Sequence, residues 1–308
     1  MKVHLDTPNG TKVIDAQFRS AEIWPPMWWI ISYWPLIIWY QQHSWWYFDA
    51  VWDMTDSGGK PVPPGGYNYR VTASVDGAFD LEAAPKPIIS PVRVELDPGH
   101  GKYLKPDGTE GYRRPPSPTY GDYEDNHNLD IAGRIVEWFC EGVEVGHYEL
   151  HLTRIDEWDL HNDWREANKM RVEKAVDDKA HLFVSTHCNA GDSPAHGTEV
   201  FYYQGDASGQ SLATDILNRL VTLNLRNRGV KSNASWPMLK GCNNNDITVA
   251  LIEAAFLTNW GLCANPAHPQ TSTTQLEENR LHDPDFRSEV GDLIHKGVED
   301  YAYGQWDF

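Results

Sequence analysis

Cysteine, basic charge and long apolar runs are all scarce in this chain of 308 residues. Its four cysteines show no C-x-x-C spacing, which excludes a thiolate zinc knot, and they are too few for a disulfide framework. Cys242 and Cys263 could pair in an oxidising compartment, a point the sequence leaves open. Only 26 lysines and arginines stand against 44 acidic residues, a net charge of −18. This balance argues against nucleic-acid binding, because a phosphate backbone requires a basic surface.

A secretory signal and a membrane span are both poorly supported. Residues 1–20 mix basic and acidic side chains and contain no apolar stretch, unlike an ordinary signal peptide. The apolar run at residues 24–40 has 17 residues and three prolines, which makes it short for a span and unfavourable for a helix. We therefore expect aromatic strands there rather than a membrane anchor.

Aromatic and turn-forming residues are abundant before residue 82. The stretch YNYRVTASV (67–75) is mostly β-forming, and glycine- and proline-rich turns separate such segments. This pattern predicts a small all-β sandwich over residues 1–81, followed by a linker at 82–91. VWDMTDSGGKPVPPGGYNYRVTA (51–73) resembles the Ig-like module of flagellar hook-capping and bacterial surface proteins. The resemblance implies an Ig-like module that binds cell wall or a partner protein, with tryptophans that either stack on sugars or fill the core.

Apolar strands and amphipathic helices alternate after residue 91. Strands are predicted at residues 92–96, 148–153, 181–187, 197–203 and 247–256, and helices at 126–141, about 164–175, 211–225 and 286–303. Such alternation predicts an α/β domain over residues 92–308, with a mixed, mainly parallel sheet covered by helices on both faces. Ligands of such sheets lie beyond the carboxyl ends of the strands.

Three predicted strands end in residues suited to metal chemistry. His100 follows the first strand on a Gly-flanked turn, His187 ends the third, and Glu253 lies inside the apolar run VALIEAAFL. Glu124 opens the first helix, where helix capping is the alternative explanation. Either histidine could instead be structural, but a lone carboxylate in an apolar strand is costly without a function. Two imidazoles and a carboxylate suit catalytic Zn²⁺, and a further carboxylate can act as general base, so the residues predict metal-assisted hydrolysis.

Seven ordered motifs make this part of the chain, about two thirds of its length, resemble the zinc-dependent N-acetylmuramoyl-L-alanine amidases. They are ELDPGHG, EDNHNLDIA, HLTRIDEW, HLFVSTHCNA, GTEVFYY, RGVK and VALIEAAFLTN, within residues 91–303. The resemblance implies one Zn²⁺ per chain held by His100, Glu124 and His187, with Glu253 as the catalytic base. It implies peptidoglycan as substrate, cleaved between N-acetylmuramic acid and L-alanine, and action at the cell wall, as for a phage lysin or an exported host enzyme.

Some positions depart from the family pattern or compete for a role. Lys102 stands where a second glycine is usual, and the loop from 101 to 123 is long and rich in Tyr, Pro and Arg, so it could shape substrate choice. Asp97 and Asn189 are candidates for support of the ligands. The alternative functions are a zinc peptidase or amidohydrolase acting on another substrate, and an inactive wall-binding protein. The competing ligand candidates are Glu110, His127 and His196; Cys188, beside His187, is better explained as a small buried residue than as a ligand.

Overall fold

The computed structural model describes residues 2–15, 17–20, 46–49, 52–74, 80–82, 87–114, 116–141, 147–191, 195–258 and 277–306. The chain divides between residues 90 and 91 into two compact units. The apolar run at 24–40 and Cys263 lie outside the described residues. Within the described ranges, no helix combines the length and the apolar character that crossing a bilayer requires.

The N-terminal unit is built from antiparallel strands. One sheet has the order β2 (Gly10–Asp15), β1 (Lys2–Thr7), β5 (Gly65–Ser74) and β6 (Asp80–Glu82), and β7 (Pro87–Ser90) also pairs with β5. A separate pair joins β3 (Gln17–Ser20) to β4 (Trp46–Asp49). Residues 87–90 of the predicted linker therefore belong to the sheet. An Ig-like sandwich stays a prediction.

A small apolar core holds the N-terminal unit together. Leu5 is fully buried, and Val3, Val62, Trp52 and Tyr67 pack around it. The rings of Trp52 and Tyr67 meet edge to face with centroids 5.3 Å apart, and the Trp52 indole donates to the Thr55 carbonyl at 2.8 Å. Trp52 is thus a core residue rather than an exposed platform for a sugar.

The second unit contains a six-stranded sheet whose arrangement confirms the predicted mixed, mainly parallel topology. The strand order is β11 (Tyr148–Leu152), β8 (Val92–Pro98), β12 (Leu182–Asn189), β15 (Thr248–Phe256), β13 (Thr198–Tyr203) and β14 (Asn227–Asn233). All neighbours are parallel except β15 and β13. β8, β12 and β15 are buried on both faces. β15 is correspondingly apolar apart from Thr248 and Glu253, whereas β8 places Arg93, Glu95 and Asp97 on one buried face.

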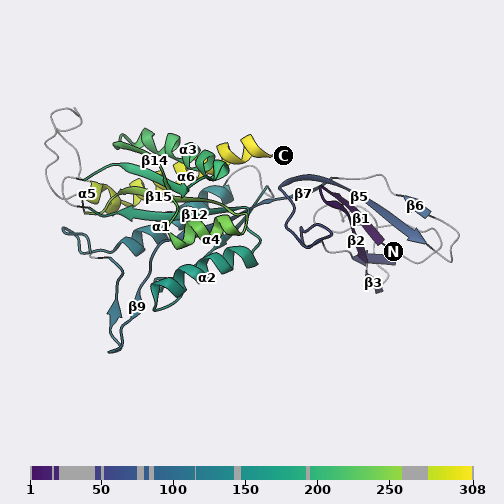
Figure 1. Cartoon of the computed structure of the whole chain (residues 1–308), viewed down its shortest axis with the longest axis horizontal. Coiled ribbons are helices and arrows are strands. Elements are labelled where there is room, and N and C mark those ends of the chain that lie inside the picture. Colours follow the sequence, from purple (N-terminus) through teal and green to yellow (C-terminus); the bar gives the residue numbers. More distant parts are fainter. Residues whose placement is uncertain are drawn as a thin grey trace. The chain divides into compact units, whose positions relative to one another are not determined.

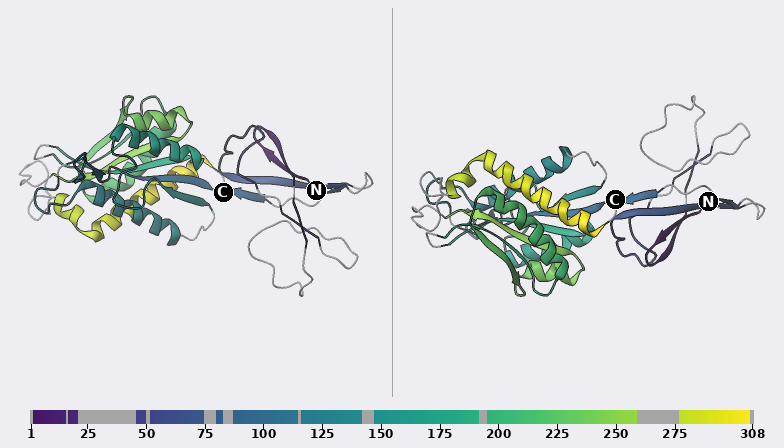
Figure 2. Two further views of the ribbon diagram at one scale, coloured as in Figure 1. Left: turned by 90° about the horizontal axis from the view of Figure 1, so that it is seen from below. Right: turned by 90° about the horizontal axis from the view of Figure 1, so that it is seen from above.

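Helices cover both faces of this sheet (Figures 1 and 2). On one face, α1 (Glu124–Glu141), α3 (Ala207–Leu220) and α6 (Pro284–Gln305) enclose the larger apolar core, which includes Leu96, Ile135 and Ile252. On the other face, α2 (Trp164–Asp177) and α4 (Pro237–Asn244) pack on Phe183, Val249 and Leu251. This second core ends before His187 and Glu253, which follow farther along the same strands.

The sequence did not predict five short elements of the second unit. These are the β9 (Tyr103–Leu104) and β10 (Glu110–Gly111) hairpin within the long loop, the edge strand β14, helix α4 and helix α5 (Glu277–His282). The 3-10 turn η1 (Val221–Leu223) ends the helix that was predicted to run to residue 225. Cys242 is a buried free thiol in α4.

Candidate metal centre

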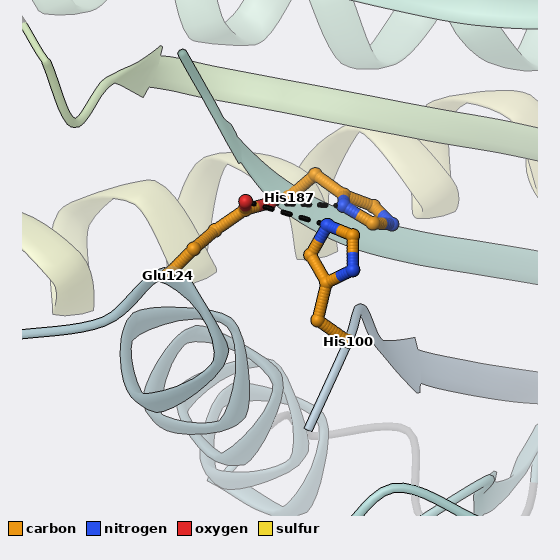
Figure 3. Close-up of side chains that lie close together, drawn as sticks. All are labelled: His100, Glu124 and His187. Carbon is orange, nitrogen blue, oxygen red and sulfur yellow. Dashed lines mark hydrogen bonds and ion pairs between the residues drawn. The ribbon is translucent and has the colours of Figure 1, made fainter. Parts of the chain in front are cut away.

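Three separate elements bring the candidate ligands together at the carboxyl edge of the sheet. His100 follows β8, His187 lies near the end of the adjacent strand β12, and Glu124 is the first residue of α1 (Figure 3). Their side chains point toward one another, and the Glu124 carboxylate faces both imidazoles. Because β8 and β12 are neighbours in the sheet, His100 and His187 meet although they are 87 positions apart in the sequence.

The distances suit a shared cation. Glu124 Oε2 lies 3.3 Å from His100 Nε2, and its Oε1 lies 3.0 Å from His187 Nδ1. One ligand atom from each residue falls within 4.8 Å of the others. Ligand atoms about 2.0 Å from a tetrahedral Zn²⁺ are about 3.3 Å apart, so a small adjustment would close this set around the ion. The donors, two imidazole nitrogens and one carboxylate oxygen, are those of a catalytic zinc site.

The Gly-His-Gly turn depends on both of its glycines. A Cβ on Gly99 would lie 2.2 to 2.6 Å from three atoms of the His187 ring, so no larger residue fits there. His100 itself has φ of 59°, a left-handed conformation that is uncommon for a non-glycine residue and is often found at functional sites. Gly101 has φ of 146°, and a Cβ there would meet the Asp159 backbone nitrogen at 2.5 Å.

Two buried arginines hold the carbonyl groups of this turn. Arg154 donates to the carbonyls of Pro98 at 2.9 Å and Gly99 at 3.1 Å. Arg171 donates to the carbonyls of Pro98 at 2.9 Å and His100 at 2.6 Å. Every carbonyl of residues 98–100 is thereby bound by a guanidinium. Burial and the neighbouring charge of Arg171 lower the pKa of Arg154 to about 10.

Several donors also fix the Glu124 carboxylate, whose side chain is only 4% exposed. Its Oε1 accepts from the Cys188 backbone nitrogen at 3.2 Å and from Asn128 Nδ2 at 3.4 Å. Burial alone would raise the pKa of Glu124, but the charge of His100 and hydrogen bonds from both imidazoles outweigh it and lower the pKa. The carboxylate therefore stays ionised, as a metal ligand must be.

Glu253 lies beside the cluster, on the strand next to His187. It stands opposite His187 in the register of β12 and β15, and its Oε2 is buried with no hydrogen-bond partner among the described residues. Burial raises the pKa of Glu253 to about 8; the charge of His187 opposes this shift, and that of Glu124 adds to it. A group in such a state can accept and return a proton near neutral pH.

Asp97 and Asn189, the two predicted supporting residues, bind side chains that lie next to the cluster. Asp97 binds Arg171, which in turn holds the His100 carbonyl. Asn189 donates to Glu199 at 2.5 Å. Glu199 is opposite Glu253 across the β13–β15 pair and is also bound by Arg228 and Lys231. In the part of the chain that the structure describes, the hydrogen bonds of Asp97 and Asn189 thus go to groups other than the three clustered side chains.

The competing ligand candidates lie outside the cluster. Glu110 is exposed on the β9–β10 hairpin with its carboxylate 3.5 Å from Lys102, and His127 pairs with Asp122 at 2.9 Å. His196 contributes its carbonyl to Arg228 at 3.4 Å. Within the described ranges, the three-residue set above is the one group close enough for a metal, and it includes none of these residues.

Sequence reasoning missed the residues that hold the site. Asn128 follows Glu124 by four positions, so both lie on one face of α1, and this spacing could have identified it. Arg171 could not be found this way, because an arginine in a helix is normally exposed. Its burial becomes evident only when α2 is placed against β8.

Comparisons with known proteins agree with this arrangement. The family model described as N-acetylmuramoyl-L-alanine amidase matches residues 94–262. The N-acetylmuramoyl-L-alanine amidase LytC of Bacillus subtilis is 28% identical over 214 residues, 68% of this chain and 35% of its own length. A protein of Bacillus anthracis named as an uncharacterized cell wall amidase is 27% identical over 219 residues, again 68% and 35%. The chain thus spans about a third of the length of these two relatives.

A solved structure shares the fold. The crystal structure of the N-acetylmuramoyl-L-alanine amidase from Clostridium difficile 630 aligns with a TM-score of 0.54 and 22% identity. The alignment covers 70% of this chain and 98% of that one. The family model covers more than half of this chain, including all four predicted site residues. The chain belongs to the N-acetylmuramoyl-L-alanine amidase family.

Proposed function

We propose that the protein hydrolyses the amide between N-acetylmuramic acid and L-alanine in peptidoglycan. One observation carries the proposal: a His-Glu-His cluster with ligand atoms within 4.8 Å lies beside Glu253, whose Oε2 is buried with no hydrogen-bond partner among the described residues. Family membership supports the choice of bond and substrate. The same geometry supports zinc as the metal, one ion per chain, because its donors are those that catalytic zinc takes.

His100, Glu124 and His187 would hold the ion, leaving one tetrahedral position free. Zinc bound there supplies the Lewis acidity that acidifies water and polarises a carbonyl. Glu253 takes the proton from the attacking water at Oε2 and returns it to the alanine nitrogen as the C–N bond breaks. Arg154 and Arg171 keep His100 in its left-handed conformation throughout, so the ligand set stays fixed.

The N-terminal unit is proposed to bind cell wall or a partner protein, and the chain to act at the wall. The resemblance of residues 51–73 to Ig-like modules supports this role. With a net charge of −18, general attraction to an anionic wall is absent, so binding would rest on specific contacts. Sedimentation of the full chain with insoluble wall, in the presence of a chelator, measures this binding apart from catalysis.

Mass spectrometry of digested peptidoglycan tests the reaction. We expect free stem peptides beginning at L-alanine, absent when a chelator is present and restored by added Zn²⁺. Muramoyl–peptide bonds left intact by protein that binds one zinc per chain would contradict the proposed substrate. That outcome would favour hydrolysis of another amide or an inactive wall-binding protein.

A further inference from the structure

Two consecutive arginines beside the candidate metal centre have opposite environments. Arg113 is fully engaged: it binds Asp159 at 3.0 Å, donates to two backbone carbonyls at 2.9 Å, and lies 4.4 Å from the centroid of the Tyr103 ring. Arg114 has a side chain that is 58% exposed, and its partner among the described residues is Glu124, with Nε 3.9 Å from Oε2. Arg114 therefore presents a guanidinium at the metal centre that no structural contact requires.

The backbone around Arg114 is held in place. Arg113 anchors one side through Asp159, and the ring of Tyr112 stacks on that of Tyr123 with centroids 3.5 Å apart and planes 6° apart. Tyr123 directly precedes Glu124, so the stack links the loop to the start of α1. A guanidinium carried on a fixed backbone loses less freedom on binding an anion than one on a loose loop.

Electrostatics indicate which kind of group Arg114 meets. A cation held by Glu124 would compete with Arg114 for the same carboxylate, which leaves the guanidinium short of negative charge. Neighbouring cations are already committed: Lys231 and Arg228 pair with Glu199, and Lys102 pairs with Glu157. An incoming carboxylate would supply the missing charge and, through two parallel hydrogen bonds, match the fork of the guanidinium.

We propose that Arg114 is a specificity-determining residue that binds the α-carboxylate of the second residue of the stem peptide. The inference rests on the proposed function, which places the scissile amide at the metal centre. Two peptide residues span about 7 Å from that amide, within reach of an arginine beside a metal ligand. The stem continues from L-alanine to D-glutamate joined through its γ-carboxyl group, so its α-carboxylate is free. Where that group is amidated, the negative charge is lost.

Calorimetry with two synthetic ligands tests the proposal. Both are N-acetylmuramoyl-L-alanyl-γ-D-glutamyl-L-lysine amide; one carries the free α-carboxylate and the other its α-amide. Zinc-loaded Glu253→Gln protein, which binds without cleaving, is expected to bind the carboxylate form about tenfold more tightly. Adding Arg114→Gln should bring the two dissociation constants within about twofold of each other. Adding Arg134→Gln instead should keep the preference, because Arg134 lies ten residues after Glu124 along α1, about 15 Å from it, and pairs with Asp130 and Glu137.

Two results would overturn the proposal. One is an equal affinity of the Glu253→Gln protein for both ligands, and the other is a tenfold preference that survives Arg114→Gln. Cleavage of the two ligands by the zinc-loaded protein with Glu253 intact is measured separately. If neither ligand is cleaved while the binding preference depends on Arg114, the proposed reaction fails and the carboxylate site stands.

Discussion

Two buried carboxylates flank the strand that carries His187, and their surroundings are opposite. Asp97 at the end of β8 lies beside Ser185, and Glu253 near the end of β15 lies beside His187. Asp97 accepts from Thr153 at 2.6 Å and from Ser185 at 2.7 Å, and it also pairs with Arg171. Glu253 Oε2 has no such partner in the part of the chain that the structure describes.

The pKa values follow from this contrast. Burial would raise the pKa of Asp97, but the charge of Arg171 and two hydroxyl donors outweigh it and lower the pKa. For Glu253, burial prevails and brings the pKa to about 8. A fully bonded carboxylate is fixed in one state and serves structure, whereas an unbonded one can exchange a proton. This contrast supports the proposal that Asp97 positions the site and that Glu253 is the catalytic base.

The strongest test of this contrast removes the proton acceptor from Glu253. Glu253→Gln should lower kcat on peptidoglycan by about a thousandfold, because a general base contributes about 10²–10⁴. Zinc content should stay at one per chain, because Glu253 is not among the clustered ligands. Turnover and metal analysis on the same preparation check both points. A loss of less than about tenfold would move the base to another residue.

Asp97→Asn tests the structural role of the fully hydrogen-bonded carboxylate. This change leaves Arg171 buried with Asp159 as its one remaining carboxylate, so we expect a loss of about 3 kcal/mol of unfolding free energy. Asp300→Asn is the matched control, since Asp300 pairs with Arg219 on the surface and its loss should cost less than about 1 kcal/mol. Urea denaturation measures both. Equal losses for the two variants would mean that Asp97 is not a structural anchor.

The sequence pointed to the side chains that come together in this region, but not to the groups that hold them. His100, His187 and Glu253 end or interrupt apolar strands, a pattern visible without coordinates, and the parallel topology implies that such ends meet at one edge. Arg154 and Arg171 carry no comparable signal, because their burial depends on how α2 and the loop after β11 pack under the turn. Asp97 was predicted as a support without its partner, since Arg171 lies 74 residues away.

The long loop was beyond prediction for a related reason. Its composition indicated a role in substrate choice, but it could not show that the neighbouring residues Arg113 and Arg114 have different partners. One side chain turns to Asp159 and the other to Glu124. Such a choice depends on contacts distant in sequence, which composition does not record.

A third prediction tests how closely the turn after β8 is fitted to His187. Gly99→Ala would place a methyl group within 2.2 to 2.6 Å of the His187 ring, so the imidazole must move. We expect zinc affinity to fall by about 10- to 100-fold, the effect of disturbing groups that orient a ligand. Gly133→Ala is the control, because a Cβ there meets nothing within 4 Å in the helix α1. Calorimetric zinc titration compares the two, and unchanged affinity in Gly99→Ala would show that the ring can shift freely.

The last prediction, with the smallest expected effect, tests whether a buried carboxylate is catalytic merely because it lacks hydrogen-bond partners. Glu95 precedes Asp97 by two residues on the same strand face and is fully buried. Neither of its oxygens meets a hydrogen-bond partner at good geometry among the described residues, although Asp178 is nearby. Glu95 lies toward α2, away from the clustered ligands, so Glu95→Gln should leave turnover unchanged.

The burial of Glu95 should affect the stability of the fold instead of turnover. Burial raises the pKa of Glu95 from 4.5 to about 8, the charge of Lys174 opposes this shift, and Asp178 adds to it. Between those pH values the folded protein keeps a proton that the unfolded chain releases, so stability falls as pH rises through the window. We expect the unfolding free energy to drop by about 2 kcal/mol more in the unsubstituted protein than in Glu95→Gln between pH 5 and 8. If the urea midpoints of the two proteins change by the same amount between pH 5 and 8, the raised pKa does not belong to Glu95. If Glu95→Gln loses turnover, then a buried carboxylate without hydrogen-bond partners can contribute to catalysis even away from the metal ligands.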